Sequence, residues 1–269
     1  GTTQDYNEAF KWYEKAALQE YASIQNILGD MYRLGQGTTQ DYNEAFKWYE
    51  KAAIQGDASS QYWLGYMYRL GLGTTRDYNE AFKWLEKAAL QDNASGQREL
   101  GDMYRLGQGT TQDYKEAFKW YEKAALQGDP SGQTKLGDMY YFGEGTTQDY
   151  NEAFKWYEKA ALQEYASIQN ILGDMYRLGQ GTTQDYNEAF KWYEKAAIQG
   201  DASSQYWLGY MYRLGLGTTR DYNEAFKWLE KAALQDNASG QRELGDMYRL
   251  GQGTTQDYKE AFKWYEKAA

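Results

Sequence analysis

The stretch GTTQDYNEAFKWYEKAA, residues 1–17, decides the fold because the chain repeats it at a fixed interval. The stretch begins again every 36 residues, with small changes, at Gly37, Gly73, Gly109, Gly145, Gly181, Gly217 and Gly253. Self-similarity with a period of about 20 to 50 residues is typical of solenoids, in which each repeat packs on its neighbours. The sequence therefore predicts seven full repeats and a terminal helix in one continuous solenoid over residues 1–269.

A longer period overlies the first one. Residues 145–269 are identical to residues 1–125, so a four-repeat block, residues 1–144, is followed by its copy. Three explanations stay open: a recent duplication, an engineered origin, and one repeat sequence applied along a longer regular object.

The first helix of each repeat is predicted to run from residue 6 to about residue 19. Asp5 and Glu8 fit a capping box, in which the aspartate accepts from a first-turn amide and the glutamate reaches back to the cap. Apolar residues at spacings of three and four then predict one buried face. These residues are Tyr6, Ala9, Phe10, Tyr13, Ala16 and Ala17.

A second helix, shorter and about twelve residues long, is predicted after an N-cap such as Asp57 or Asn93. It ends at Gly35 and its equivalents, where glycine permits the left-handed backbone conformation. A glycine in mid-helix costs about 1 kcal/mol relative to alanine, so the recurrence of Gly29 predicts a close helix crossing. Its inward face is predicted to carry Gln25, Leu28, Gly29 and Tyr32. Each repeat is therefore an antiparallel helical hairpin.

Three segments of the repeat carry a family resemblance. Residues 28–32 (LGDMY), 35–37 (GQG) and 41–53 (DYNEAFKWYEKAA) are similar to the Sel1-like repeat family, a relative of the tetratricopeptide repeats. The resemblance implies an all-α, right-handed superhelix. It also implies that the second helices line the concave surface and the first helices the convex one, as in adaptor proteins of secretion-linked, degradative and signalling assemblies.

Three rows of residues on the second helix differ between repeats. Residues 26, 30 and 33, with their equivalents, lie on one helical face because their spacings are four and three. The rows are Asn26, Tyr62, Arg98 and Thr134; Asp30, Tyr66, Asp102 and Asp138; and Arg33, Arg69, Arg105 and Tyr141. By the resemblance, this face is concave.

These rows predict a ligand-binding groove, because tyrosine and arginine are enriched among interface hot spots. The predicted groove residues are Tyr62, Tyr66, Arg69, Arg98, Asp102, Arg105 and Tyr141, with Tyr206, Tyr210, Arg213, Arg242, Asp246 and Arg249 in the copy. The alternative is a solvated surface that is free to vary. Eight tryptophans recur every 36 residues and are predicted to pack between hairpins, whereas Trp63 and Trp207 fit either role.

Composition excludes several classes of function. Without cysteine or histidine, the chain has no disulfide, no thiol catalysis and no metal site of ordinary type, and we expect no cofactor. Carboxylates are the remaining candidates for catalysis, but Asp5 and Glu8 recur in every repeat as caps, so no enzyme is expected. A net charge of -10 disfavours nucleic acid and anionic lipid as partners. No apolar stretch approaches the roughly 20 residues that cross a bilayer, and Gly1 has no apolar secretory segment before it.

The sequence thus predicts a scaffold that binds proteins or peptides. The alternative is a self-associating structural or engineered repeat protein that forms filaments, because the first and last helices keep the same aromatic residues as the interior ones and predict adhesive ends. Asn93 and Asn237 each begin an N-glycosylation acceptor pattern, but Asn93 is explained more simply as a helix cap.

Overall fold

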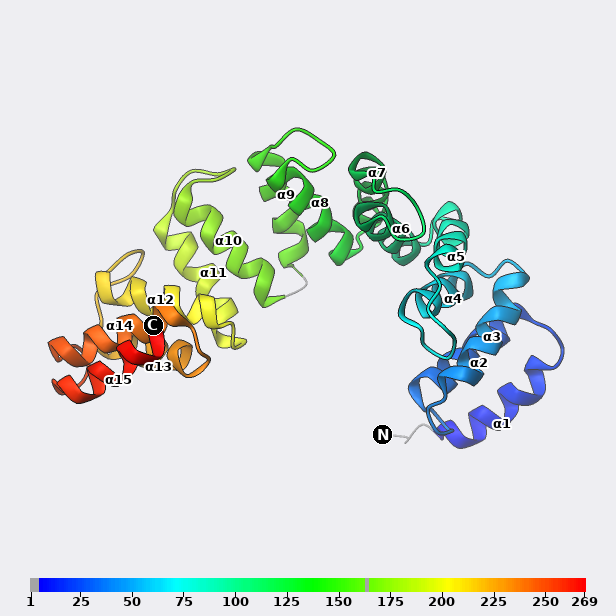
Figure 1. The fold of residues 1–269 in the computed structure, drawn as a ribbon, viewed down its shortest axis with the longest axis horizontal. Helices are drawn as coiled ribbons and strands as arrows, with labels where there is room; N and C mark the ends of the chain where they lie inside the picture. Colours follow the sequence, from blue (N-terminus) through cyan, green and yellow to red (C-terminus); the bar gives the residue numbers. More distant parts are fainter. Residues whose placement is uncertain (1–4, 163–164) are drawn as a thin grey trace. The chain divides into compact units, whose positions relative to one another are not determined.

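In a computed structural model of the chain, residues 5–162 and 165–269 are described, and they form fifteen α-helices without a strand (Figure 1). The chain divides into two compact units, residues 1–147 and 148–269. Unit 1 contains α1 (Tyr6–Ala17), α2 (Ala22–Leu34), α3 (Tyr42–Ile54), α4 (Ala58–Leu70), α5 (Tyr78–Leu90), α6 (Ala94–Leu106), α7 (Tyr114–Leu126) and α8 (Pro130–Phe142). Unit 2 contains α9 (Tyr150–Ala161), α10 (Ala166–Leu178), α11 (Tyr186–Ile198), α12 (Ala202–Leu214), α13 (Tyr222–Leu234), α14 (Ala238–Leu250) and α15 (Tyr258–Ala268).

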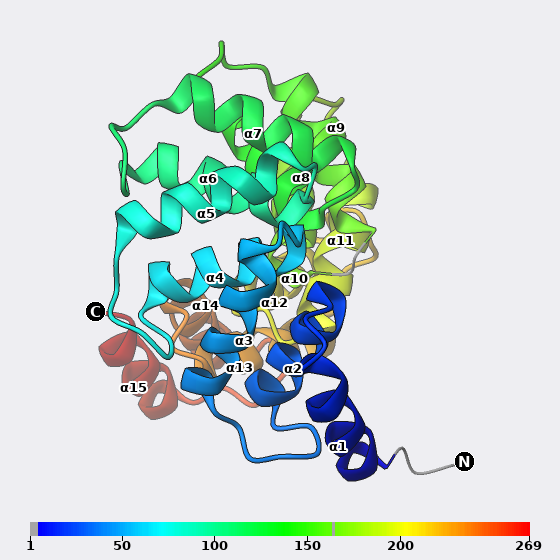
Figure 2. The same ribbon diagram turned by 90° about the vertical axis from the view of Figure 1, so that its right-hand side faces the viewer.

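Odd-numbered helices are the first helices of the repeats and even-numbered helices the second. Within each unit, the second helices pack on the first helix of their own repeat and on that of the next, and the unit 1 helices α3 to α7 follow one another in chain order (Figure 2). The helical solenoid predicted from the repeats is confirmed. Over the described residues, no helix has the length and apolar character needed to cross a membrane.

The second helix of a repeat is as long as the first or one residue longer, so the expectation of a shorter second helix is wrong. The helices α3 and α4 each have 13 residues. The first helix ends sooner than predicted because the chain turns at Gly56, whose φ is +98°. The second helix continues to Leu70, next to the left-handed Gly71.

The predicted capping box is half correct. Asp41 is the N-cap of α3, and its carboxylate accepts from the amides of Asn43 and Glu44 at 2.8 and 3.1 Å. The amide of Asp41, however, donates to the carbonyl of Tyr32 at 2.9 Å, so it needs no bond from a glutamate. Glu44 instead accepts from Lys47 at 2.6 Å. The cap therefore also fixes α3 to α2, and the same bond recurs at Asp77, Asp113, Asp185, Asp221 and Asp257.

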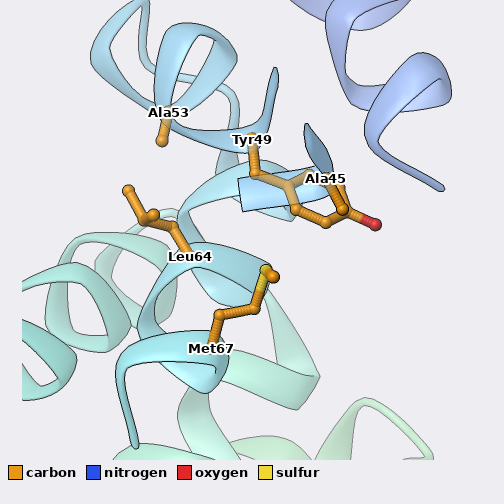
Figure 3. Close-up of a cluster of buried hydrophobic side chains, with 5 residues drawn as sticks. All are labelled: Ala45, Tyr49, Ala53, Leu64 and Met67. Atoms are coloured by element: carbon orange, nitrogen blue, oxygen red, sulfur yellow. The ribbon is translucent and has the colours of Figure 1, made fainter. Parts of the chain in front are cut away.

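The core of each hairpin packs alanines and one large residue of the first helix against large residues of the second. In Figure 3, Ala45, Tyr49 and Ala53 of α3 face Leu64 and Met67 of α4, and all five are buried. Full burial of a leucine or methionine side chain stabilises a fold by about 1.5–3 kcal/mol. Alanines on α3 leave room for these larger side chains, so the core is a repeated small-to-large match.

The close crossing predicted at mid-helix glycines is confirmed. A Cβ atom added to Gly29 would lie 2.7 Å from Cδ1 and Cε1 of Tyr49, and one added to Gly101 would lie 2.7 Å from the same atoms of Tyr121. Both tyrosines belong to the first helix of the next repeat and are fully buried. The glycines therefore allow neighbouring repeats to contact each other closely.

Candidate protein-binding surface

Helix α4 carries three aromatic residues that pack against one another on its partly exposed face. The ring centroids of Tyr62 and Trp63 are 4.9 Å apart, and Tyr66 meets Trp63 edge to face at 5.8 Å. From α2 of the preceding repeat, the guanidinium carbon of Arg33 lies 3.9 Å from the Trp63 ring centroid. We call Arg33, Tyr62, Trp63 and Tyr66 the ring cluster. Its part-exposed rings and guanidinium are groups that interface hot spots use.

A buried tyrosine supports the cluster from behind. Tyr49 stacks on Trp63 with ring centroids 6.0 Å apart, and its hydroxyl donates to Asp30 Oδ1 at 2.7 Å. Arg33 donates to the same carboxylate at 2.8 Å and to the Tyr49 hydroxyl at 3.0 Å. Burial raises the pKa of Tyr49 well above its ordinary value, and the Asp30 charge raises it further. Arg33 is thus held in place over Trp63 by two hydrogen-bond partners.

The next repeat junction replaces this hydrogen-bonded pair with a tyrosine and a leucine. Tyr66 occupies the position of Asp30, and Leu85 occupies the position of Tyr49. Arg69, which is equivalent to Arg33, therefore lacks that carboxylate and binds the next repeat instead. It donates to Glu99 and, through Nε, to Gln108 Oε1 at 3.0 Å.

Glu99 of α6 connects two of the predicted groove residues. Its side chain is 4% exposed and forms ion pairs with Arg69 and with Arg98, the latter at 2.6 Å. Arg98 also lies 3.5 Å from Asp129, the N-cap of α8. Burial raises the pKa of Tyr62, and the nearby charge of Glu99 adds to the effect. Glu99 was not predicted from the sequence, because it lies in a row outside the three that were compared.

The remaining predicted residues of unit 1 lie on α6 and α8. Asp102 accepts from the Tyr121 hydroxyl at 2.6 Å. Burial acts to lower the pKa of Arg105, but Tyr121, Asp102 and Glu144 together raise it. Tyr141 packs edge to face on Phe142, with ring centroids 5.0 Å apart. The tyrosines of the predicted groove thus contact other rings, and its arginines lie against acidic groups.

Unit 2 repeats most of the arrangement, with differences at two arginines. Tyr206, Trp207 and Tyr210 form the same ring contacts on α12, with Arg177 3.9 Å from the Trp207 centroid. Arg213 binds Glu243 and Gln252 as Arg69 binds Glu99 and Gln108. Asp246 accepts from Tyr265 at 2.7 Å and from Arg249 at 2.9 Å. One difference is the bond from Arg249 Nε to Asp246, because Nε of the equivalent Arg105 has no hydrogen-bond partner within the described part of the chain. The other is Arg242, whose side chain is 64% exposed, against 19% for Arg98.

Family comparison agrees with the hairpin geometry. The Sel1 repeat model matches residues 1–21, 23–57, 58–93, 94–129, 130–165, 167–201, 202–237 and 238–269. The chain belongs to the Sel1 repeat family. Sel1 repeats generally act as scaffolds for protein interactions and are generally non-catalytic.

Two solved structures resemble the chain over nearly its whole length. One is c5321, a protective antigen present in uropathogenic Escherichia coli strains that displays an SLR fold, with 38% identity and a TM-score of 0.93. The other is a Sel1 repeat protein from Oxalobacter formigenes, with 35% identity and a TM-score of 0.72. The chain is covered to 99% and 97% in the two comparisons, but it spans 57% and 75% of the lengths of those proteins. No curated protein is similar enough to count as a match.

Among the recurring tryptophans, Trp84 has the packing role predicted for it and Trp156 is buried, whereas Trp12 is 68% exposed and does not have that role. Trp84 packs against the core cluster of α3 and α4 in the preceding repeat. Its outer face is covered by Lys87, whose Nζ lies 4.0 Å from the ring centroid. Trp63, for which two roles were open, both stacks on buried Tyr49 and contributes to the partly exposed ring cluster. Asn93 is a helix cap as predicted, accepting from the Gly96 amide at 2.8 Å.

Proposed function

We propose that this Sel1 repeat chain is a protein- or peptide-binding scaffold whose binding surface is the face of the second helices. The observation that carries the proposal is the ring cluster, which is partly exposed and occurs once in each unit. Aromatic rings held rigidly by neighbours provide contact area at little cost in side-chain entropy. Tyr62 and Tyr66, with Tyr206 and Tyr210 in unit 2, are both predicted groove residues and members of these clusters. The scaffold role, without catalysis, is the function we infer for the whole chain.

Variation between repeats supports the same surface. The first helices are nearly constant, whereas the second-helix rows change chemistry from repeat to repeat. A ligand that contacts several repeats meets different groups at each step, which is what recognition of a non-repetitive peptide requires. Two copies of the cluster also permit avidity where one partner spans both.

The test replaces one tyrosine of each cluster by the residue that another repeat carries at the same position. Tyr62→Asn with Tyr206→Asn introduces the residue found at Asn26, so the hairpins are expected to fold. The matched control is Tyr21→Asn with Tyr165→Asn, which removes two exposed tyrosines outside the clusters. Proteins captured from a lysate of the source cells are then compared by quantitative mass spectrometry. Partners lost with the first pair and retained with the control support the surface; equal capture by both pairs contradicts it.

Self-association is the second candidate, favoured by a row of exposed aliphatic residues at the ends of first helices. In unit 1 these are Leu18, Ile54, Leu90 and Leu126, with exposures of 76, 71, 68 and 70%. Regularly spaced exposed apolar groups favour contact with another surface of the same spacing. Light scattering over a concentration series measures this directly, and a mass of 31.2 kDa at every concentration would remove the candidate.

A further inference from the structure

One loop position before the first helix differs between repeats. In most repeats it is glutamine, and Gln40 donates to the carbonyl of Arg33 at 2.8 Å and to the Tyr42 hydroxyl at 3.2 Å. Gln112 makes the equivalent bonds at 2.8 and 3.1 Å. This glutamine therefore fixes the loop to the end of the preceding second helix. Arginine occupies the position at Arg76 and Arg220 alone.

These two arginines have no acidic partner. Both are exposed, and over the described residues neither has a carboxylate within ion-pair distance. The nearby Arg213, by contrast, is bound to Glu243 and Gln252. The loop substitution thus exchanges an internal hydrogen-bonding group for an uncompensated positive charge.

In unit 2 the free arginine lines a pocket of about 300 Å³. The pocket is formed by Tyr210, Arg213, Leu214, Arg220, Tyr222, Glu243 and Gln252. Arg213 is paired with Glu243, whereas Arg220 has no carboxylate partner among the described residues, so its charge is available to a ligand. Unit 1 has the same residue types at Tyr66, Arg69, Leu70, Arg76, Tyr78, Glu99 and Gln108. There Arg69 makes the same contacts to Glu99 and Gln108.

Two substitutions in adjacent repeats make the lining of this pocket more positive than the equivalent positions of the preceding repeats. Tyr66 stands where the preceding repeat has Asp30, and Arg76 stands where it has Gln40, and each change adds one positive charge. The whole chain carries a net charge of -10, so the pocket is a local positive site on an acidic protein. Such a site attracts anionic groups that the rest of the surface repels.

We propose that the Arg220 pocket, and its Arg76 counterpart, binds a carboxylate of a peptide ligand, an inference that rests on the proposed function. A guanidinium donates two parallel hydrogen bonds to a carboxylate, and the hydroxyls of Tyr210 and Tyr222 are further donors. One uncompensated cation matches a single negative charge. A phosphate carries nearly two charges and would also meet Glu243, so the carboxylate fits better.

The test variant restores the glutamine found in the other repeats. Arg76→Gln with Arg220→Gln is expected to fold, because the residue has the same surroundings at Gln40 and Gln112. The control is Lys115→Asn with Lys259→Asn, which removes two exposed charges and introduces the residue that other first helices carry. Both variants change the net charge by the same amount. The probe is a fluorescein-labelled, C-terminally amidated peptide of alternating glycine and glutamate, measured by fluorescence polarisation.

We expect the arginine variant to raise the Kd for this peptide by at least about tenfold, because each site loses a hydrogen bond from a charged group. The control variant should leave the Kd nearly unchanged. Equal weakening by both variants would mean that net charge alone drives binding, which overturns the pocket. An amidated glycine-glutamine peptide should not bind. The glycine-glutamine peptide with a free C-terminus tests whether the pocket binds a terminal carboxylate, whereas the amidated glycine-glutamate peptide tests side-chain carboxylates. Binding of either peptide that depends on the two arginines supports the proposal.

Two other outcomes would contradict the pocket. Preferential binding of a glycine-phosphoserine peptide would reassign it to phosphate. Failure of every anionic peptide to bind, while partner capture still depends on Tyr62 and Tyr206, would reject the pocket and leave the proposed scaffold function intact.

Discussion

The Tyr49 hydroxyl lies 2.7 Å from Asp30 Oδ1, although the two residues belong to different repeats. The bond joins residues 19 positions apart, and Tyr121 with Asp102 and Tyr193 with Asp174 form the same bond at the same separation. Where the aspartate becomes Tyr66, the tyrosine becomes Leu85. The paired change shows that the second-helix rows are matched to the first helix of the next repeat as well as being partly exposed.

This matching predicts strong coupling between positions 30 and 49. Asp30→Tyr alone places a second ring against Tyr49, and Tyr49→Leu alone leaves a cavity and a carboxylate with one donor fewer, so each should cost about 2 kcal/mol. The double variant recreates the Tyr66 and Leu85 pair. We expect it to recover at least about 1 kcal/mol relative to the sum, as measured by urea unfolding. Asp30→Tyr with Tyr121→Leu, at separate junctions, should be additive; coupling of similar size there would contradict the pairing.

The close crossing at Gly101 predicts a steric cost that a conformational control separates from backbone strain. A Cβ at Gly101 would lie 2.7 Å from the buried Tyr121 ring, whereas one at Gly128 would meet nothing within 4 Å but requires φ of +87°. Gly128→Ala should therefore cost about 1 kcal/mol, and Gly101→Ala about 2 kcal/mol or more. Hydrogen exchange should localise the second effect to α6 and α7. Unchanged amide protection in these helices would show that the crossing tolerates a side chain.

The sequence predicted the elements that depend on local signals. Aspartate caps of the first helices and left-handed glycines recur along the chain, and the glycine crossing recurs within each unit, so their positions were correct. The partners of the groove arginines could not be predicted in this way, because Arg33, Arg69 and Arg105 are identical in sequence but meet different residues of the following repeat. Arg33 meets Trp63, and Arg69 meets Glu99, 30 positions further on in each case. One usable signal remained in the sequence. When the repeats are aligned with one another, Asp30 and Tyr49 change together to Tyr66 and Leu85, and this joint change indicates that the two positions are in contact.

Buried tyrosines predict a loss of stability at alkaline pH. The pKa of Tyr49, Tyr121 and Tyr193 is raised above the ordinary value of 10.0, mainly by burial and then by the paired aspartate. In the unfolded chain these groups ionise near pH 10, while the folded chain keeps them protonated. Below about pH 10, ionisation of these tyrosines should therefore not change the free energy of unfolding. Above pH 10 the free energy of unfolding should fall by up to about 1.4 kcal/mol per pH unit for each tyrosine. Tyr49→Phe should reduce the slope in urea titrations, and an unchanged slope would exclude its ionisation as a cause.

The two copies of one ion pair provide the last prediction. Glu99 binds Arg69 and Arg98, which are 15 and 19% exposed, so Glu99→Ala leaves two poorly solvated cations without their principal partner. Loss of one member of a buried pair costs on the order of 3 kcal/mol. At Glu243 the second arginine, Arg242, is 64% exposed and lies 3.7 Å away, so water replaces the lost charge more readily. Glu243→Ala should therefore perturb α12 and α14 less than Glu99→Ala perturbs α4 and α6, as measured by hydrogen exchange of both variants. Equal loss of protection would show that the exposure of the second arginine does not set the cost.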